Sequence, residues 1–127
     1  MNLTLITKDY SLVRRLAFEG YAEWKLDIAG FGQSGAVDEG FIPDSDYAGE
    51  DIDAAVELII KESGQDKRDL LGWSWGTVTA TRCASKHTEH LNRLVLYAPI
   101  LSGLGNYEVS EEFRHNTWEH AADDFLA

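Results

Sequence analysis

The sequence predicts an α/β fold in which a parallel sheet of about three or four strands is flanked by helices. Strand-like and helix-like segments alternate along the 127 residues, and this order is typical of α/β proteins. The apolar run at residues 94–97 has no polar alternation, as expected for a strand buried on both faces of a parallel sheet. The length matches one domain of about 100–150 residues. We therefore expect a single domain over residues 1–127, with its core in residues 1–100.

The first half of the chain is expected to contain two strands and two helices. Periodicity predicts strands at residues 3–7 and 21–28 and helices at residues 12–19 and 46–63, with a loop at residues 30–44 before the second helix. Ser45 or Asp46 can cap the second of these helices. Gly20 and Gly64 are expected to end the two helices, because glycine is favoured just beyond a helix C-terminus.

The second half is expected to repeat the alternation. Strands are predicted at residues 69–73 and 94–97, and helices at residues 75–87 and 117–125. An irregular segment separates the last strand from the last helix. The pattern weakens after Pro99, so residues 101–127 are interpreted as the start of a segment outside the core.

Charge and composition exclude several classes of partner. There are 11 Lys and Arg residues against 22 Asp and Glu residues, and the net charge of −11 repels nucleic acid and anionic lipid surfaces. No apolar run is long enough for a membrane helix, and the N-terminus lacks the pattern of a signal peptide, so a cytoplasmic protein is expected. Cys83 is the single cysteine, which leaves no internal disulfide and predicts a packed thiol.

A G-x-S-x-G motif carries the strongest indication of chemistry. It runs from Gly72 to Gly76, directly after a predicted strand and directly before a predicted helix. This is the context of a nucleophile elbow, in which a strained turn presents a serine hydroxyl. Ser74 is therefore the candidate nucleophile, and the backbone N–H of Trp75 is the candidate oxyanion donor. Small residues are expected at both glycine positions because the backbones approach closely. The alternative is a tight turn with an idle serine.

A second glycine motif suggests a dinucleotide site, which we reject. Gly30, Gly32 and Gly35 match G-x-G-x-x-G after a predicted strand. That fingerprint needs a helix opening at the motif to bind the pyrophosphate. The chain reaches Gly40 and Pro43 instead, so no such helix is expected, and a dinucleotide-binding domain is the less favoured alternative.

Together the two glycine motifs resemble the α/β-hydrolase superfamily. Residues 27–34 read D-I-A-G-F-G-Q-S, which is similar to the D-x-x-G-x-G-x-S loop after the fourth strand of that family, and they begin 47 residues before Ser74 (74 − 27). The resemblance implies that residues 21–28, 69–73 and 94–97 are the fourth, fifth and sixth strands. It also implies that a lid departs at residues 97–100 and that the chain covers the middle of the fold.

The resemblance implies a serine hydrolase of esterase type. Ser74 would attack a small-molecule acyl substrate at an ester, thioester or amide bond, and a peptidase remains open. Serine at the elbow, rather than aspartate, argues against the dehalogenase and epoxide-hydrolase branches. No metal and no organic cofactor is implied. Trp73 and Trp75 flank the serine and would either wall an apolar acyl pocket or pack in the core.

Two departures from the family pattern leave the site incomplete. Residues 7–9 stand where the family has a His-Gly loop that supplies a second oxyanion donor. Only 53 residues follow Ser74, which leaves room for the sixth strand but not for the strands that usually precede the triad acid and histidine. An incomplete chain, weakly active or inactive alone, is therefore expected. The competing hypothesis is a non-catalytic fragment or binding module.

None of the four histidines is expected to complete the triad. His87 and His90 follow the helix after Ser74 and would lie about 18 Å from its hydroxyl, at about 1.5 Å per residue, so they are interpreted as surface histidines. His115 and His120 follow several glutamates but fall in the expected lid, where they are interpreted as polar lid positions.

Overall fold

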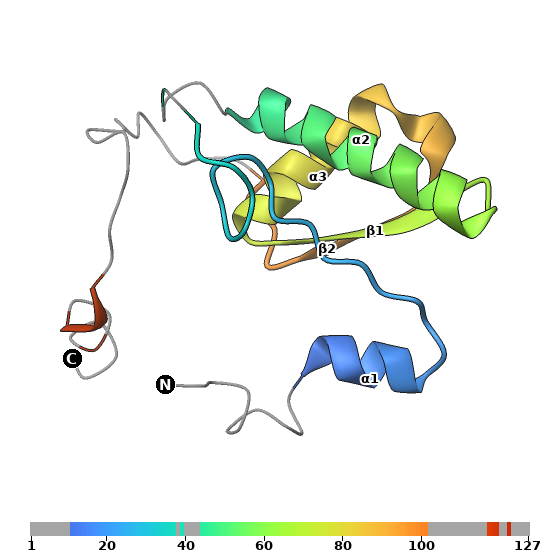
Figure 1. Cartoon of the computed structure of the whole chain (residues 1–127), viewed down its shortest axis with the longest axis horizontal. Coiled ribbons are helices and arrows are strands. Elements are labelled where there is room, and N and C mark those ends of the chain that lie inside the picture. The colour runs from blue at the N-terminus through green and yellow to red at the C-terminus, as the bar shows by residue number, and fades with distance from the viewer. Residues whose placement is uncertain (1–10, 38, 40–43, 102–116, 120–121, 123–127) are drawn as a thin grey trace.

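A computed structural model describes residues 11–37, 39, 44–101, 117–119 and 122. Most of the regular structure falls between residues 45 and 97 (Figure 1). In chain order the elements are α1 (Leu12–Phe18), α2 (Ser45–Ser63), β1 (Arg68–Trp73), α3 (Trp75–Lys86), the 3-10 helix η2 (Thr88–His90) and β2 (Leu91–Tyr97). Among the described residues, no helix is long and apolar enough to cross a membrane.

The described part of the sheet contains two parallel strands. β1 pairs with β2 from Leu70 opposite Leu94 to Trp73 opposite Tyr97, and α3 connects the two strands. The α/β class and the parallel pairing are therefore confirmed.

The strand expected at residues 21–28 is absent, so the described sheet has two strands and not three or four. This segment has no strand partner in the described residues. At its end the Ala29 N–H donates to the side chain of Asp51 at 2.9 Å, which is a loop contact and not a step of a ladder. Alternating hydrophobicity alone does not make a strand, because the backbone groups need a partner strand.

The ends of α2 follow from short-range hydrogen bonds. Asp44, not Ser45 or Asp46, caps the helix, and its Oδ1 accepts the backbone N–H groups of Asp46 and Tyr47 at 2.9 Å each. The helix therefore begins at Ser45, one residue earlier than expected. Gly64 ends it in a left-handed conformation with φ +67°, as the sequence predicted.

α1 lies apart from the other described elements (Figure 1). Its N-cap is Ser11, whose hydroxyl accepts the backbone N–H of Arg14. The expected stop at Gly20 is confirmed, since the helix ends at Phe18 and Gly20 adopts φ +93°. No residue of α1 is buried, so its apolar side chains do not contribute to the core.

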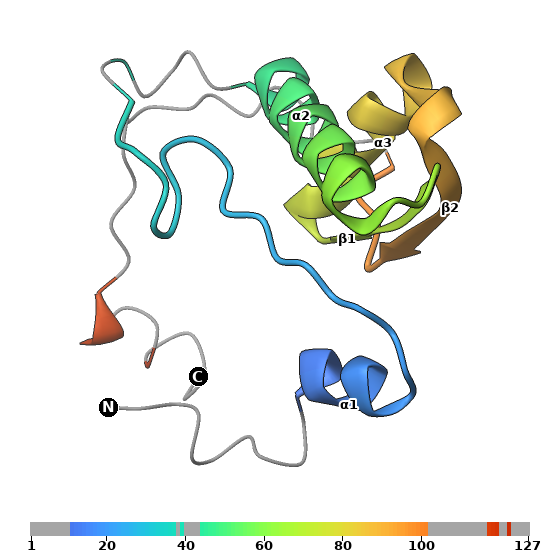
Figure 2. The same ribbon diagram turned by 45° about the vertical axis from the view of Figure 1, so that its right-hand side comes forward.

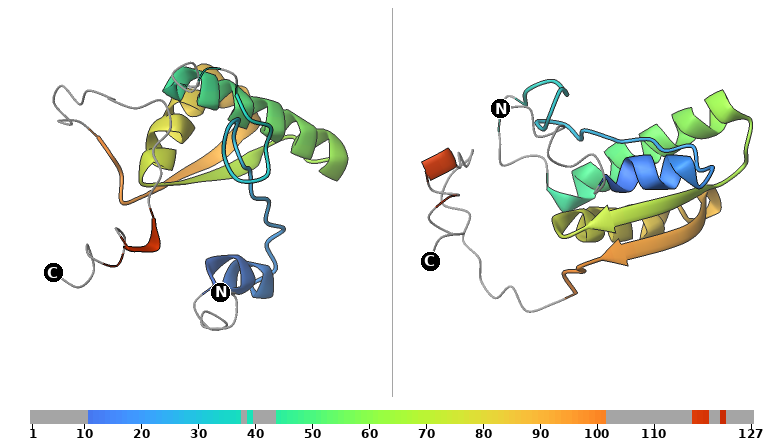
Figure 3. Two further views of the ribbon diagram at one scale, coloured as in Figure 1. Left: turned by 60° about the vertical axis from the view of Figure 1, so that its left-hand side comes forward. Right: turned by 90° about the horizontal axis from the view of Figure 1, so that it is seen from below.

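The core forms where α2 packs against α3 on one side of the sheet (Figures 2 and 3). Ile52 and Val56 of α2 meet Cys83 of α3 there, and Cys83 is fully buried. Close approach is possible at Gly49, where a Cβ atom would lie 3.2 Å from the Cys83 backbone nitrogen. The packed thiol is confirmed, and burial raises its pKa to about 11.

No element among the described residues covers the opposite face of the sheet. Leu71 and Trp73 of β1 point to this face, and so do Val95 and Tyr97 of β2, which are their register partners. Trp73 and Tyr97 are 68% and 65% exposed. Burial on both faces was expected for the second strand and is not observed in the described residues, because α2 and α3 lie together on the other side.

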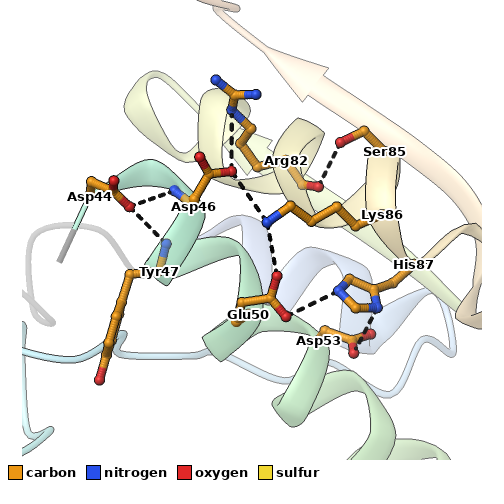
Figure 4. Close-up of polar contacts among 9 residues, drawn as sticks. All are labelled: Asp44, Asp46, Tyr47, Glu50, Asp53, Arg82, Ser85, Lys86 and His87. Atoms are coloured by element: carbon orange, nitrogen blue, oxygen red, sulfur yellow. Dashed lines mark hydrogen bonds and ion pairs between the residues drawn. The ribbon is translucent and has the colours of Figure 1, made fainter.

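Polar contacts hold α2 against the end of α3 (Figure 4). Lys86 lies 3.0 Å from Glu50 and 3.4 Å from Asp46, and the hydrogen bond to Lys86 lowers the pKa of Glu50. His87, which caps α3, places Nε2 3.2 Å from Glu50 and Nδ1 3.1 Å from Asp53. These contacts connect the last turn of α3 to the first half of α2.

His90 extends this connection to η2. Its Nδ1 lies 3.0 Å from Asp53, and Asp53 is only 8% exposed. His87 and His90 lie at the surface as expected, but both are partly buried and bonded to α2. The hydrogen bond to the Asp53 carboxylate raises the pKa of His90, and the charges of Asp53, Glu89 and Glu57 act in the same direction.

We expect the contribution of His90 to stability to depend on pH. Its pKa is higher in the folded chain than the unfolded value of about 6.5, so its stabilising contribution is complete below that value and disappears as pH rises through the folded pKa. Urea unfolding from pH 5 to 9 should therefore give the largest difference between wild type and His90→Gln at low pH. A difference that is constant across this range would contradict the prediction.

Candidate active site

Ser74 occupies a strained turn between β1 and α3. Its backbone adopts φ +53° and ψ −121°, a region that residues with a side chain rarely occupy. The residue is exposed, and its hydroxyl makes no hydrogen bond within the described part of the chain. The Ser74 N–H donates to the Tyr97 carbonyl at 3.1 Å, so the end of β2 holds the turn in place. This is the elbow geometry that the motif predicted.

The two motif glycines are required to different degrees. A Cβ atom at Gly72 would lie 2.4 Å from the Gly76 carbonyl oxygen and 2.9 Å from the Thr77 Cα. A Cβ atom at Gly76 would meet nothing within 4 Å. The expectation of close backbone approach is therefore confirmed at Gly72 and wrong at Gly76, because the crowding arises where the strand passes under the first turn of α3.

Alanine substitutions at Gly72 and Gly76 should therefore have different effects on the free energy of unfolding. We expect Gly72→Ala to lower the free energy of unfolding by about 1–3 kcal/mol, because the new methyl group overlaps the backbone of α3. Gly76→Ala should be neutral or stabilising by up to about 1 kcal/mol, because alanine favours the helix over glycine. Urea unfolding of both variants measures the difference. Equal losses at the two positions would contradict the assigned geometry.

A buried threonine connects the turn to the segment that follows β2. Thr77 is 1% exposed, and its hydroxyl donates to the Ser74 carbonyl at 2.6 Å. The same oxygen accepts the Ile100 N–H at 3.1 Å. Thr77 was not singled out from the sequence, and the only signal was its position directly after the motif. Its contacts show that the elbow depends on residues about 25 positions further along the chain.

The strain at Ser74 should be measurable by comparing two small substitutions. Glycine tolerates positive φ and alanine does not, so Ser74→Gly should unfold at higher urea concentration than Ser74→Ala. We expect a difference of about 1 kcal/mol, after allowing for the greater flexibility of glycine in the unfolded chain. Far-UV circular dichroism gives the unfolding curves. A more stable alanine variant would mean that the turn is relaxed.

The loop after residues 21–28 lies beside the elbow. The Asp27 carboxylate accepts the Gln33 N–H at 2.9 Å, and a Cβ atom at Gly32 would overlap that carboxylate. These contacts fold the loop so that the Phe31 ring lies 5.9 Å from the Trp75 ring. The two sequence motifs, 47 residues apart, are therefore brought together (74 − 27).

The two tryptophans that flank Ser74 have different surroundings. Trp75 contacts Phe31, whereas Trp73 meets Tyr97 edge-on at 6.1 Å on the uncovered face of the sheet. Both remain exposed, so neither packs in the core in the described structure. Trp75 is the first residue of α3, and its N–H has no acceptor within the helix. The positive end of the helix dipole lies at the same position, which suits a developing negative charge.

The histidines considered from the sequence either lie far from Ser74, as expected, or fall outside the described residues. His87 and His90 are at the other end of α3, which is 12 residues or about 18 Å long. His115, His120 and residues 7–9 lie outside the described part of the chain. After Gly35 the next described helix begins only at Ser45, so no helix N-terminus follows the glycine loop directly.

Comparison with known families identifies the chain. A family model described as serine aminopeptidase, S33, matches residues 7–120. The chain belongs to this family. The S33 family has the α/β-hydrolase fold, so the resemblance seen in the two motifs is confirmed, and the short chain is consistent with a partial fold. Neither the curated proteins nor the solved structures gave a match.

Proposed function

We propose that Ser74 is the nucleophile of a serine hydrolase that cleaves ester, thioester or amide bonds. The positive φ of this exposed serine, held between a strand and a helix, supports the proposal most directly. Such strain costs about 1–3 kcal/mol and persists only where surrounding contacts maintain it. A serine with a purely structural role would gain nothing from that cost. Membership of a hydrolase family supports the same assignment.

The chemistry follows the general course of acyl transfer. The Ser74 oxygen attacks the substrate carbonyl carbon while its proton passes to a general base, and the carbonyl oxygen becomes an oxyanion. The Trp75 N–H donates a hydrogen bond to that oxyanion. The leaving group departs with a proton, and water then releases the acyl group from the serine. Within the described residues no histidine lies within hydrogen-bond reach of Ser74, so neither His87 nor His90 is the proposed general base.

We further propose that the site beside Ser74 recognises an apolar acyl group of the substrate. Phe31 and Trp75 form an exposed aromatic pair at the start of α3, where the reacting carbonyl would bind. Aromatic faces favour apolar or aromatic groups over charged ones. The family description names a serine aminopeptidase, so a peptide amide and a small-molecule ester are the two substrate types to compare.

A fluorophosphonate probe tests the nucleophile on the 127-residue chain itself. We expect slow covalent labelling at Ser74, mapped by peptide mass spectrometry, because the elbow exposes the hydroxyl beside an oxyanion donor but no described histidine can take its proton. Ser74→Ala should abolish the labelling. Ser85→Ala, which changes an exposed serine on the same helix, should leave it unchanged. Labelling at another serine that is unaffected by Ser74→Ala would overturn the assignment.

A binding module is the second candidate function, and the position of His87 and His90 favours it. Both histidines are bonded to α2 and lie about 18 Å from Ser74, at about 1.5 Å per helical residue. A chain that binds acyl compounds without a general base would bind a p-nitrophenyl ester but would not be labelled by the probe. The labelling experiment therefore distinguishes the two candidates.

A further inference from the structure

A cluster of metal-ligating side chains lies at the end of α3 that is remote from Ser74. Asp53 and Glu57 are four residues apart on α2 and therefore share one face of that helix. His90 approaches the same face from η2. One ligand atom from each of these three residues lies within 4.8 Å of the others. The residues come from segments 37 positions apart (90 − 53), so the tertiary fold creates the cluster.

His87 lies outside this three-residue group but adds a second imidazole beside it and a contact typical of metal ligands. Its Nδ1 lies 3.1 Å from Asp53 Oδ2, while its Nε2 lies 3.2 Å from Glu50 (Figure 4). Histidines that bind metal through one nitrogen usually donate the other N–H to a carboxylate, which fixes the orientation of the ring. Glu50 is itself held by Lys86 at 3.0 Å. His87 therefore has the outer carboxylate that a metal-bound imidazole requires.

The local charge also favours a cation. The Nδ1 atoms of His87 and His90 each face one carboxylate oxygen of Asp53. Three carboxylates, from Glu50, Asp53 and Glu57, gather there, and Asp53 is nearly buried. A divalent ion bound among these groups would balance their negative charge, while His87 Nε2 would still face Glu50.

We propose that Asp53, Glu57, His90 and His87 form a zinc site that joins α2 to the segment between α3 and β2. Two imidazoles and two carboxylates suit zinc or cobalt better than calcium or magnesium, which prefer oxygen ligands alone. A tetrahedral zinc ion holds its ligand atoms about 3.4 Å apart, so the ligand atoms of Asp53, Glu57 and His90, now within 4.8 Å of one another, would move closer on binding. The site lies at the opposite end of α3 from Ser74, so it is structural and independent of the proposed hydrolase activity.

The proposal is tested with Zn²⁺ and Co²⁺ on the untagged, chelator-treated 127-residue chain. Calorimetry at pH 7.5 should give one Zn²⁺ per chain with release of protons, and Co²⁺ should give visible absorption bands of nitrogen and oxygen coordination. His90→Gln and Asp53→Asn should weaken Zn²⁺ binding at least about 100-fold. Glu50→Gln, which keeps all four ligands, should weaken it about 10–100-fold.

Two matched controls complete the experiment. Glu62→Gln removes an exposed acid of the same helix, and the double variant His115→Gln/His120→Gln removes the other two histidines. Both should keep wild-type affinity. Where a variant is less stable, the rise in its unfolding temperature on adding Zn²⁺ is compared with its own metal-free value. Absence of saturable binding, unchanged affinity in His90→Gln and Asp53→Asn, or loss of binding in the double variant would each overturn the proposal.

Discussion

The strained turn at Ser74 is the constraint on which the arrangement of β1, α3 and β2 depends. It joins β1 to α3 through a backbone conformation that is unfavourable for serine. Three features maintain it, namely the absence of a side chain at Gly72, the hydroxyl of Thr77 and the carbonyl of Tyr97. The last of these belongs to β2, so the turn needs the paired strand in place. The elbow is thus a product of the sheet and not only of its five-residue motif.

The two ends of α3 carry different chemistry. The N-terminal end presents an exposed hydroxyl, an unbonded N–H and an aromatic pair. The C-terminal end presents basic and imidazole groups that contact the carboxylates of α2. Cys83 lies between them, and because burial raises its pKa to about 11, the thiol is protonated at neutral pH. It therefore offers no competing nucleophile, and the chemistry of this helix is confined to its ends.

The uncovered face of the sheet bears directly on the candidate site. Trp73 and Tyr97 are exposed on this face, and they adjoin Ser74 through the chain and through the Tyr97 carbonyl. Parallel sheets in α/β proteins are normally covered on both faces. Any element that covers Trp73 and Tyr97 would therefore also border the serine and shape the space available to an acyl group.

Local sequence determined the helix ends, the β–α–β order and the position of the candidate nucleophile. Gly20 and Gly64 end helices because they adopt positive φ, and the local G-x-S-x-G motif sets which serine occupies the turn. The family followed from the same local motifs. The cap was not decided locally, since Asp44 and its neighbours Ser45 and Asp46 can all offer an oxygen, and Asp44 takes the role with an extended backbone.

Tertiary structure alone decided the remaining features. Residues 21–28 alternate like a strand but have no strand partner in the described residues, and pairing is a property of two segments. His87 and His90 are polar and close to a helix end, which in sequence resembles a solvated surface. Their contacts with Asp53 exist only because α2 packs beside α3. Thr77 likewise acquires its role from Ile100, 23 residues away. Contacts between distant segments have no local pattern, because burial and distance arise only when the chain has folded.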